Sequence, residues 1–307
     1  MLAFALRRLV SAVPTLFIVV TLSFFLMRIA PGGPFNLERP LEPQVLANLN
    51  RVYELDQPLV VQYVHYLWNV LHGDFGPSFV YRDYTVAELI LQALPYSVIL
   101  GSFALVISVI GGIAVGTFAA LRQNSAIDYA VMSMATIGTT VPNFVVGPVL
   151  SLVFAVMLRL VPAGGWGNGG FDDLVLPMVA LALPQLAVFA RLTRGSMIEA
   201  LRADHVRTAR AYGLPARSVV VRHALRAALM PAVSYLGPAA AGLLTGSVVV
   251  ETIFSLPGVG RYFVLGALNR DYTLVMGTVV LISVFIVVFN LIVDILYAVI
   301  DPRVRYE

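Results

Sequence analysis

Six long stretches of the chain are almost entirely apolar, and shorter segments of mixed polarity separate them. They cover residues 9–27, 96–121, 129–158, 174–190, 232–253 and 274–300. Each is near or above the roughly 17–25 residues that a helix needs to cross a bilayer. None alternates polar and apolar positions as barrel strands do. The pattern predicts an all-α membrane protein with six transmembrane helices, forming a single domain over residues 1–307.

Two of these stretches have features that affect their borders. Arg7 and Arg8 precede the first stretch, as basic residues do in signal peptides. That stretch is too long for the apolar part of a signal peptide and lacks a small-x-small cleavage site, so we expect a retained helix. The fourth stretch is the shortest and contains Pro177 and Pro184, so its borders are the least defined.

The composition narrows the chemistry open to the chain. Of its residues 59% are hydrophobic and 12% are charged, whereas about a quarter are charged in soluble domains. All 20 basic residues are arginine, and lysine and cysteine are absent. This excludes a lysine-containing P-loop, lysine catalysis, disulfides and cysteine-ligated metals. We expect a chain that is not an enzyme and that binds no cofactor itself.

The placement of arginines predicts the orientation. With the N-terminus in the cytoplasm, 13 of the 20 arginines lie on the inner side, while the first outer loop has three arginines and seven acids. Because cytoplasmic loops are enriched in basic residues, both termini are expected inside. The inner set is Arg7, Arg8, Arg122, Arg191, Arg194, Arg202, Arg207, Arg210, Arg217, Arg222, Arg226, Arg303 and Arg305. The net charge of +3 reflects this topology and does not indicate nucleic-acid binding.

The large extracytoplasmic loop, residues 31–95, contains two helical stretches. The first begins near Pro43; in the second, Asp56 can cap a helix with Pro58 in its first turn, and Gly73 ends it. One face of the second helix carries Leu59, Tyr63, Tyr66 and Val70. Such helices could dock a partner, lie along the membrane surface or pack on the span ends, and the pattern leaves these alternatives open.

The cytoplasmic loop, residues 191–231, contains eight arginines and two acids. From Ser196, apolar residues alternate with arginines until Gly213, Leu214 and Pro215. Glycine suits a left-handed helix end, and proline suits the first turn of the next helix. We therefore expect a helix–turn–helix hairpin on the cytoplasmic face, able to contact anionic lipid or an acidic partner.

This loop contains a specific series of residues. They are Arg207-Thr208-Ala209-Arg210-Ala211-Tyr212-Gly213-Leu214-Pro215, Arg222-His223-Ala224-Leu225 and Leu229-Met230-Pro231. The series resembles the cytoplasmic signature of ABC-importer inner-membrane permeases, in the form found in the peptide-uptake branch. Arg207 stands where the general signature has glutamate, and Pro231 lies further from Gly213. The peptide branch shares both departures.

Shorter strings elsewhere are similar to the same branch. They are Leu6-Arg7-Arg8 with Pro14-Thr15, Arg28-Ile29-Ala30-Pro31-Gly32, Gly73-Asp74-Phe75-Gly76-Pro77-Ser78, Glu251-Thr252-Ile253-Phe254 with Pro257-Gly258-Val259-Gly260, and the closing segment from Asp294 to Tyr306. Each string is weak alone, but together they follow the family order over nearly the whole chain. The chain resembles the oligopeptide and dipeptide permeases, and most of all their B-type subunit in oligopeptide importers.

The resemblance implies partners and a mechanism. It implies a multi-pass permease of the bacterial inner membrane that pairs with a second homologous permease. Two cytosolic ABC ATPases would bind ATP and Mg, and an extracytoplasmic binding protein would deliver peptide. A coupling helix would contact an ATPase, through Glu199, Arg207, Thr208, Ala209, Arg210 and Gly213. The substrate stays open among oligopeptides, dipeptides, murein peptides, glutathione and nickel.

Polar residues and a proline near the middle of the third stretch are candidates for lining a pathway. These are Thr139, Thr140, Pro142 and Asn143, with Ser247 in the fifth stretch. A plain proline kink is an equal alternative. Gly242 and Gly246 have the spacing of a helix-packing motif, either at a permease–permease interface or within the subunit.

Three further groups of ionisable residues have alternative interpretations. Asp294, well inside the sixth stretch, is expected to be a structural intramembrane charge; the alternative is a proton relay in a proton-coupled secondary transporter. Glu251 is interpreted as a hydrated helix end rather than a gate contact. His65 and His72 are interpreted as solvated surface residues rather than metal ligands. An intramembrane protease is disfavoured, because no histidine lies in a predicted span and Asp294 has no second aspartate there.

Overall fold

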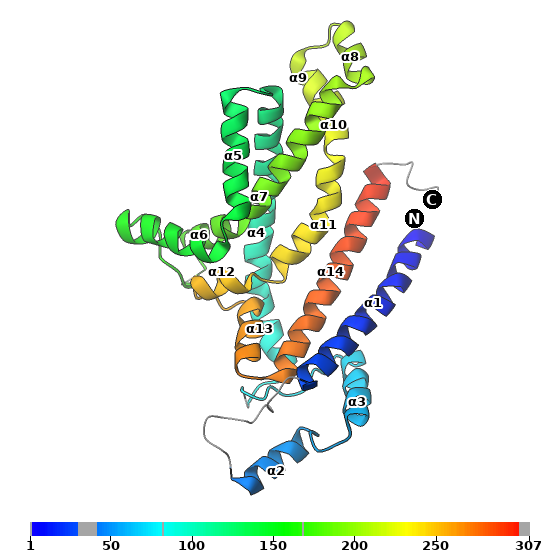
Figure 1. Cartoon of the computed structure of the whole chain (residues 1–307), viewed down its shortest axis with the longest axis vertical. Coiled ribbons are helices and arrows are strands. Elements are labelled where there is room, and N and C mark those ends of the chain that lie inside the picture. The colour runs from blue at the N-terminus through cyan, green and yellow to red at the C-terminus, as the bar shows by residue number, and fades with distance from the viewer. Residues whose placement is uncertain (1, 30–41, 82, 168, 301–307) are drawn as a thin grey trace.

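In a computed structural model, which describes residues 2–29, 42–81, 83–167 and 169–300, the chain is an elongated helical bundle (Figure 1). Five helices are long and apolar enough to cross a membrane, and a bent pair makes up to six. These spans are formed by α1 (Leu2–Ile29), α4 (Val86–Leu121), α7 (Phe171–Arg202), α11 (Met230–Leu244) together with α12 (Val248–Ile253), and α14 (Tyr272–Ile300). This confirms the all-α membrane fold. Arg39, Arg82, Arg303, Arg305 and the Ala30-Pro31-Gly32 string lie outside the described residues.

The third predicted span is not one helix. It consists of α5 (Ala126–Thr140), α6 (Asn143–Leu150) and a π-helical turn, η1 (Ser151–Met157), with a bend of 106° after α5. Val141, before Pro142, adopts an extended conformation, because a residue preceding proline avoids the helical region. The break is therefore larger than the proline kink that was the alternative, and α6 projects sideways from the bundle in Figure 1.

The fifth span is also interrupted. Helix α11 ends at Leu244, Gly246 has a φ of +91°, and α12 (Val248–Ile253) follows, with the Ser247 hydroxyl accepting a hydrogen bond from the backbone N–H of Val250 (3.3 Å). Gly246 thus lies in a turn, and a Cβ added at Gly242 would meet nothing within 4 Å. The two glycines therefore do not form a helix-packing motif within the subunit, and the alternative of a permease–permease interface stays a prediction.

The second span begins earlier than predicted, at Val86 rather than residue 96. Thr85 and Glu88 form a capping box: the Thr85 hydroxyl accepts from the N–H of Glu88 (3.2 Å), and the Glu88 carboxylate accepts from the N–H of Thr85 (2.8 Å). A capping box satisfies two N–H groups that a helix start leaves unpaired. Pro95 therefore lies inside α4 and does not mark its start.

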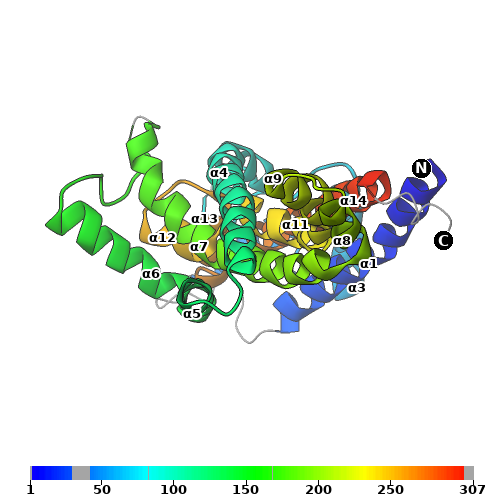
Figure 2. The same cartoon turned by 90° about the horizontal axis from the view of Figure 1, so that it is seen from above.

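The core of the bundle is the contact between α4 and α7, the most extensive helix pair in the described structure. Gly112 and Gly116 of α4 allow the close approach, since an added Cβ would come within 2.8 Å of the Leu186 carbonyl and 2.4 Å of the Ala190 carbonyl respectively. Small residues at this spacing let helices approach closely in membranes. Seen from above, α1 and the α5–α6 pair extend to opposite sides of this cluster (Figure 2).

Opposite ends of the bundle carry the two predicted loops. One end has α8 (Asp204–Ala211), α9 (Ala216–Ser218), the π-helical η2 (Val219–Ala224) and α10 (Leu225–Ala228). The other end has α2 (Pro43–Val52), α3 (Leu59–Leu71) and α13 (Val259–Leu268). Helix α2 begins at Pro43 as predicted. Helix α3 begins one residue after Pro58 with no side-chain cap, so the capping role given to Asp56 is wrong.

Candidate functional site

The arginine-rich hairpin projects beyond the long helices as a small unit with its own apolar core. Helix α7 ends at Arg202, Ala203 is extended, and α8 turns away as a separate helix. One helix was expected from Ser196 to Gly213, and the break at Ala203 divides it. Buried Val206 and Ala209 of α8 pack with Met197 of α7 and Val219 of η2.

This packing decides which coupling residues are at the surface. Arg207, Thr208 and Arg210 are exposed on α8, and Glu199 is exposed on the last turns of α7. Ala209 faces the core of the hairpin and is 4% exposed. Ala209 therefore positions α8, while its exposed neighbours are free to meet a partner.

The end of α8 is a Schellman turn around Gly213. The N–H of Leu214 donates to the carbonyl of Ala209 (3.3 Å), and the N–H of Gly213 donates to Arg210 (2.9 Å). Gly213 has a φ of +73°, and an added Cβ would meet nothing within 4 Å. Glycine is favoured here because it adopts the left-handed conformation without strain. The turn presents Tyr212, which is 83% exposed, at the tip of the hairpin.

The surface of the hairpin is basic and weakly paired. Arg207 lies 3.5 Å from Asp204, and both side chains are largely exposed. Arg202 donates to Gln123 (3.2 Å), which links the hairpin to the α4–α5 turn. Exposed ion pairs contribute little stability, so these arginines are available for a negatively charged partner surface.

The pathway candidates lie in the two interrupted spans. Thr139 and Thr140 end α5, Pro142 and Asn143 form the corner to α6, and half-buried Ser247 caps α12. The Asn143 side-chain oxygen is buried without a hydrogen-bond partner. Helices α6 and α12 pack together where Gly147 meets Ile253. The α5–α6 corner is partly exposed at the side of the bundle, and the role of these residues in lining a pathway stays a prediction.

Glu251 of α12 is fully buried, so its interpretation as a hydrated helix end is wrong. Its carboxylate accepts hydrogen bonds from the Ser97 hydroxyl (2.7 Å) and the backbone N–H of Arg261 (3.3 Å). A Cβ added at Gly246 or Gly258 would come within 2.6 Å of the carboxylate group. The glycines make room for the carboxylate, which ties the first turn of α13 to α4.

Two sets of comparisons identify the family. A family model described as the binding-protein-dependent transport system inner membrane component matches residues 112–306, and a model of the N-terminal part of such components matches residues 1–101. The chain belongs to this family of transport-system membrane components. Its members are inner-membrane permeases that work with ATPases, a binding protein and a second permease. The chain is therefore a multi-pass inner-membrane permease and not itself an enzyme.

Individual relatives match over their full length. The chain is 54% identical over 306 residues to the oligopeptide transport system permease protein OppB of Salmonella typhimurium, covering 100% of both chains. It is 51% identical to OppB of Haemophilus influenzae, again covering 100% of both. It is 43% identical over 305 residues to the dipeptide transport system permease protein DppB of Bacillus subtilis, covering 99% of this chain and 98% of the relative. The resemblance to oligopeptide and dipeptide permeases is confirmed.

In this permease, Asp294 lies between two spans, α14 and α1. It lines a cavity of about 200 Å³ between α14 and α1, together with Asn290, Ser11 and Thr15. The other residues that line this cavity belong to α1 and α14. The structural role of Asp294 stays a prediction.

An ion pair that the sequence did not single out fixes the inner end of the permease. Arg194 of α7 donates to both carboxylate oxygens of Asp128 on α5, at 2.5 and 2.6 Å. The Asp128 side chain is 1% exposed. The sequence contains only a weak signal for it, an acid in the first turn of a helix beside a basic loop, because nothing in the spacing pairs residues 66 positions apart.

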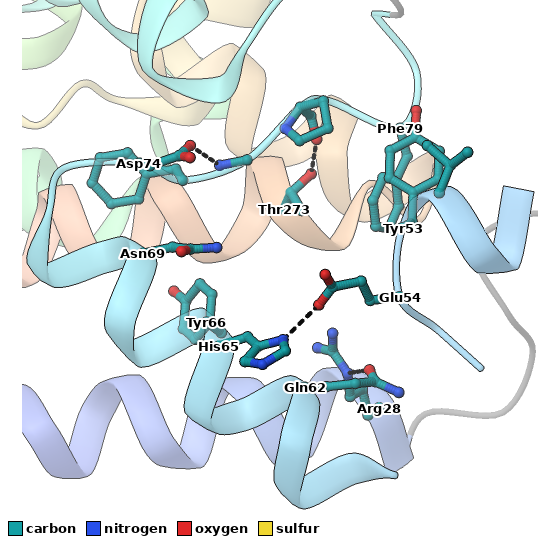
Figure 3. Close-up of a pocket in the computed structure, with 14 residues that line it drawn as sticks. Arg28, Tyr53, Glu54, Gln62, His65, Tyr66, Asn69, Asp74, Phe79 and Thr273 are labelled. Atoms are coloured by element: carbon teal, nitrogen blue, oxygen red, sulfur yellow. Dashed lines mark hydrogen bonds and ion pairs between the residues drawn. The ribbon is translucent and has the colours of Figure 1, made fainter. Parts of the chain in front are cut away.

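A polar cavity of about 210 Å³ lies at the outer end (Figure 3). It is bounded by the end of α1, by α3 and by the Asp74–Phe79 segment, and Arg28 donates to Gln62 at its floor (2.8 Å). Tyr66 also lines the cavity. Burial raises the pKa of its phenol above the ordinary value, and the nearby charge of Arg28 offsets only part of that rise. His65 contacts Glu54 (2.8 Å), and His72 contacts the Trp68 carbonyl. Among the described residues no group of three histidines or acids could hold a metal.

Proposed function

We propose that this permease forms one half of the translocation pathway of an ATP-driven oligopeptide importer. The observation that carries the proposal is the hairpin: a separate, basic helix held by its own core at the tip of the α7–α10 unit. The relatives at 51–54% identity are named as oligopeptide permeases, and a relative named for dipeptides is at 43%. This difference supports oligopeptides as the substrate class.

The proposed partners follow from the two ends of the molecule. A second homologous permease completes the pathway, and two cytosolic ATPases bind ATP and Mg, since this chain has no lysine for a P-loop. The exposed face of α8, with Arg207, Thr208 and Arg210, contacts one ATPase together with the nearby Glu199 of α7. Closure of the ATPase pair moves this hairpin, and because α7 continues from it into the bundle, the movement reaches the spans. The result is alternating access driven by contacts that differ between two states.

The family membership favours this function over a proton-coupled secondary transporter. Proton coupling would depend on Asp294, which lies between α1 and α14. A proton-coupled transporter should lose peptide uptake when a protonophore is added or when Asp294 is replaced by asparagine. The importer should keep peptide uptake under both conditions as long as ATP is maintained.

Replacing Gly213 with valine tests the coupling role. The φ of +73° costs an L-residue about 1–2 kcal/mol, and a β-branched side chain tolerates this conformation least. The Schellman turn should open and misplace α8. We expect loss of labelled tri- to pentapeptide uptake in cells lacking their own importer, with a normal amount of protein in the membrane.

Two substitutions serve as matched controls. Gly213→Asn should keep most of the uptake, because asparagine tolerates the left-handed conformation. Gly195→Ala, in the helical part of α7 with open space around it, should leave uptake unchanged. Normal uptake by the valine variant would show that the turn does not couple the ATPase to the pathway.

A further inference from the structure

Helix α3 in the outer loop has three distinct faces. Tyr63 and Tyr66 pack against the rings of Phe24 and Phe25 in α1, with ring centroids 5.3–5.6 Å apart. Gln62, His65 and Asn69 face the polar cavity. The third face is apolar and exposed: Val60 (68%), Val64 (55%), Trp68 (64%) and Leu71 (81%). The spacing of four, four and three residues puts these four side chains on one stripe.

The contacts of α3 with α1 fix its depth. The hydroxyls of Thr21 and Tyr63 are hydrogen-bonded (2.5 Å), and Thr21 lies in the candidate membrane span Val10–Ile29. At a rise of 1.5 Å per residue, Thr21 is about 12 Å inside the outer end of that span. The Tyr63 hydroxyl therefore reaches hydrocarbon depth, while the adjacent Gln62 meets Arg28 near the outer end of the span (2.8 Å), so α3 lies against the part of α1 that crosses the outer leaflet.

We propose that α3 is inserted in the outer leaflet and that lipid acyl chains cover its stripe of Val60, Val64, Trp68 and Leu71. The helix contains no Asp, Glu, Lys or Arg, so insertion buries no charge. Its polar side chains are directed to the cavity, and buried Gln62 is satisfied by Arg28, Leu55 and Gln57. Trp68, whose ring contacts that of His72, is a residue type enriched at the membrane interface.

Continuity with α1 favours lipid over a protein as the occupant of this surface. Helix α1 carries an exposed apolar stripe with the same spacing, Ile18, Leu22, Leu26 and Ile29. The two helices pack together at the level of Thr21, so their exposed stripes belong to one hydrophobic belt. The outer loop is thus anchored in the membrane at α3, and its polar surface for other proteins is reduced to α2 and the cavity side.

The absence of cysteine allows a direct test. Nitroxide labels are placed by Val64→Cys, Leu22→Cys and Asn69→Cys in the full-length permease, purified with its associated subunits and reconstituted in liposomes. Leu22 is the reference for the exposed surface of α1, and Asn69 is the matched control on the cavity face of α3. Collisions with oxygen report hydrocarbon, and collisions with a water-soluble nickel chelate report water.

We expect the label at position 64 to behave like that at position 22, with a several-fold higher ratio of oxygen to chelate collisions than at position 69. A high chelate collision rate at position 64 would place α3 in water and overturn the proposal. Protection from both agents would mean that protein covers the stripe, which also overturns it.

Discussion

At the scale of single residues, Glu251 shows how a carboxylate is accommodated in full burial. Ser97 and the N–H of Arg261 donate to it, and glycines leave the space it occupies. The sequence position near a span end suggested a hydrated residue. The turn at Gly246 and the loop before α13, which come together only in the fold, enclose it instead.

Removing the Glu251 carboxylate should therefore destabilise the permease. In Glu251→Ala, the Ser97 hydroxyl and the Arg261 N–H lose their acceptor, and each unsatisfied donor costs about 1–3 kcal/mol. We therefore expect the free energy of unfolding to fall by roughly 2–6 kcal/mol. A lower Tm in detergent would show this loss. Glu251→Gln, which keeps one oxygen acceptor, should lose less. Glu199→Ala, at an exposed carboxylate, should leave the Tm unchanged. Equal Tm values for the two alanine variants would contradict the structural role of Glu251.

The Asp128–Arg194 pair makes a second prediction at this scale. Because Asp128 is buried and bound at two points, removing one partner leaves an uncompensated charge, at a cost of about 3–5 kcal/mol. Arg194→Lys should also destabilise, because lysine cannot make the bidentate contact. In a double-mutant cycle, Asp128→Ala with Arg194→Ala should cost less than the sum of the two single changes. Additive losses of stability would show that the pair is not coupled.

At the scale of elements, the close approach of α4 and α7 depends on glycine. A Cβ at Gly116 would come 2.4 Å from the Ala190 carbonyl, whereas one at Gly195 meets nothing within 4 Å. Gly116→Ala should thus destabilise through overpacking by about 1–3 kcal/mol. The same substitution at Gly195 should stabilise α7 by about 0.5–1 kcal/mol. Thermal unfolding of the two variants should show Tm shifts of opposite sign, and an unchanged or higher Tm for Gly116→Ala would mean that α7 moves away without cost.

The apolar pattern predicted the number and approximate place of the spans because bilayer thickness sets a length that composition reveals directly. It did not predict the 106° break after α5 or the turn at Gly246, because a continuous helix and an interrupted one can have the same apolar composition. Two local signals were present in the sequence but were not used in the prediction: the capping box of Thr85 and Glu88, which marks the start of α4, and the spacing of Gly112 and Gly116, which marks its packing face.

The candidate site was predictable to a similar degree. Gly213 and the second helix after Pro215 followed from turn chemistry. The break at Ala203 and the inward position of Ala209 depend on packing against Val219, which is distant in sequence. Contacts of this kind, like those of Asp128 and Glu251, cannot be inferred without the fold.

At the scale of the whole molecule, the basic hairpin and the α2–α3 region lie at opposite ends of the bundle. Peptide import needs this separation, because the ATPases and the binding protein act on different sides of the membrane. The first turn of α1 and the last turn of α14 point toward the hairpin end in Figure 1. The arrangement agrees with the arginine distribution that predicts both termini in the cytoplasm.

This orientation can be measured with single cysteines in the cysteine-free chain. Tyr212→Cys places a thiol at the tip of the hairpin, 83% exposed, and Val45→Cys places one on α2, 44% exposed. In spheroplasts, a membrane-impermeant maleimide should label position 45 at once and position 212 only after permeabilisation, because basic loops stay in the cytoplasm. Labelling of position 212 in intact spheroplasts would invert the topology and remove the hairpin from the reach of any cytosolic ATPase. Orientation is thus the condition on which the coupling role of Gly213 depends.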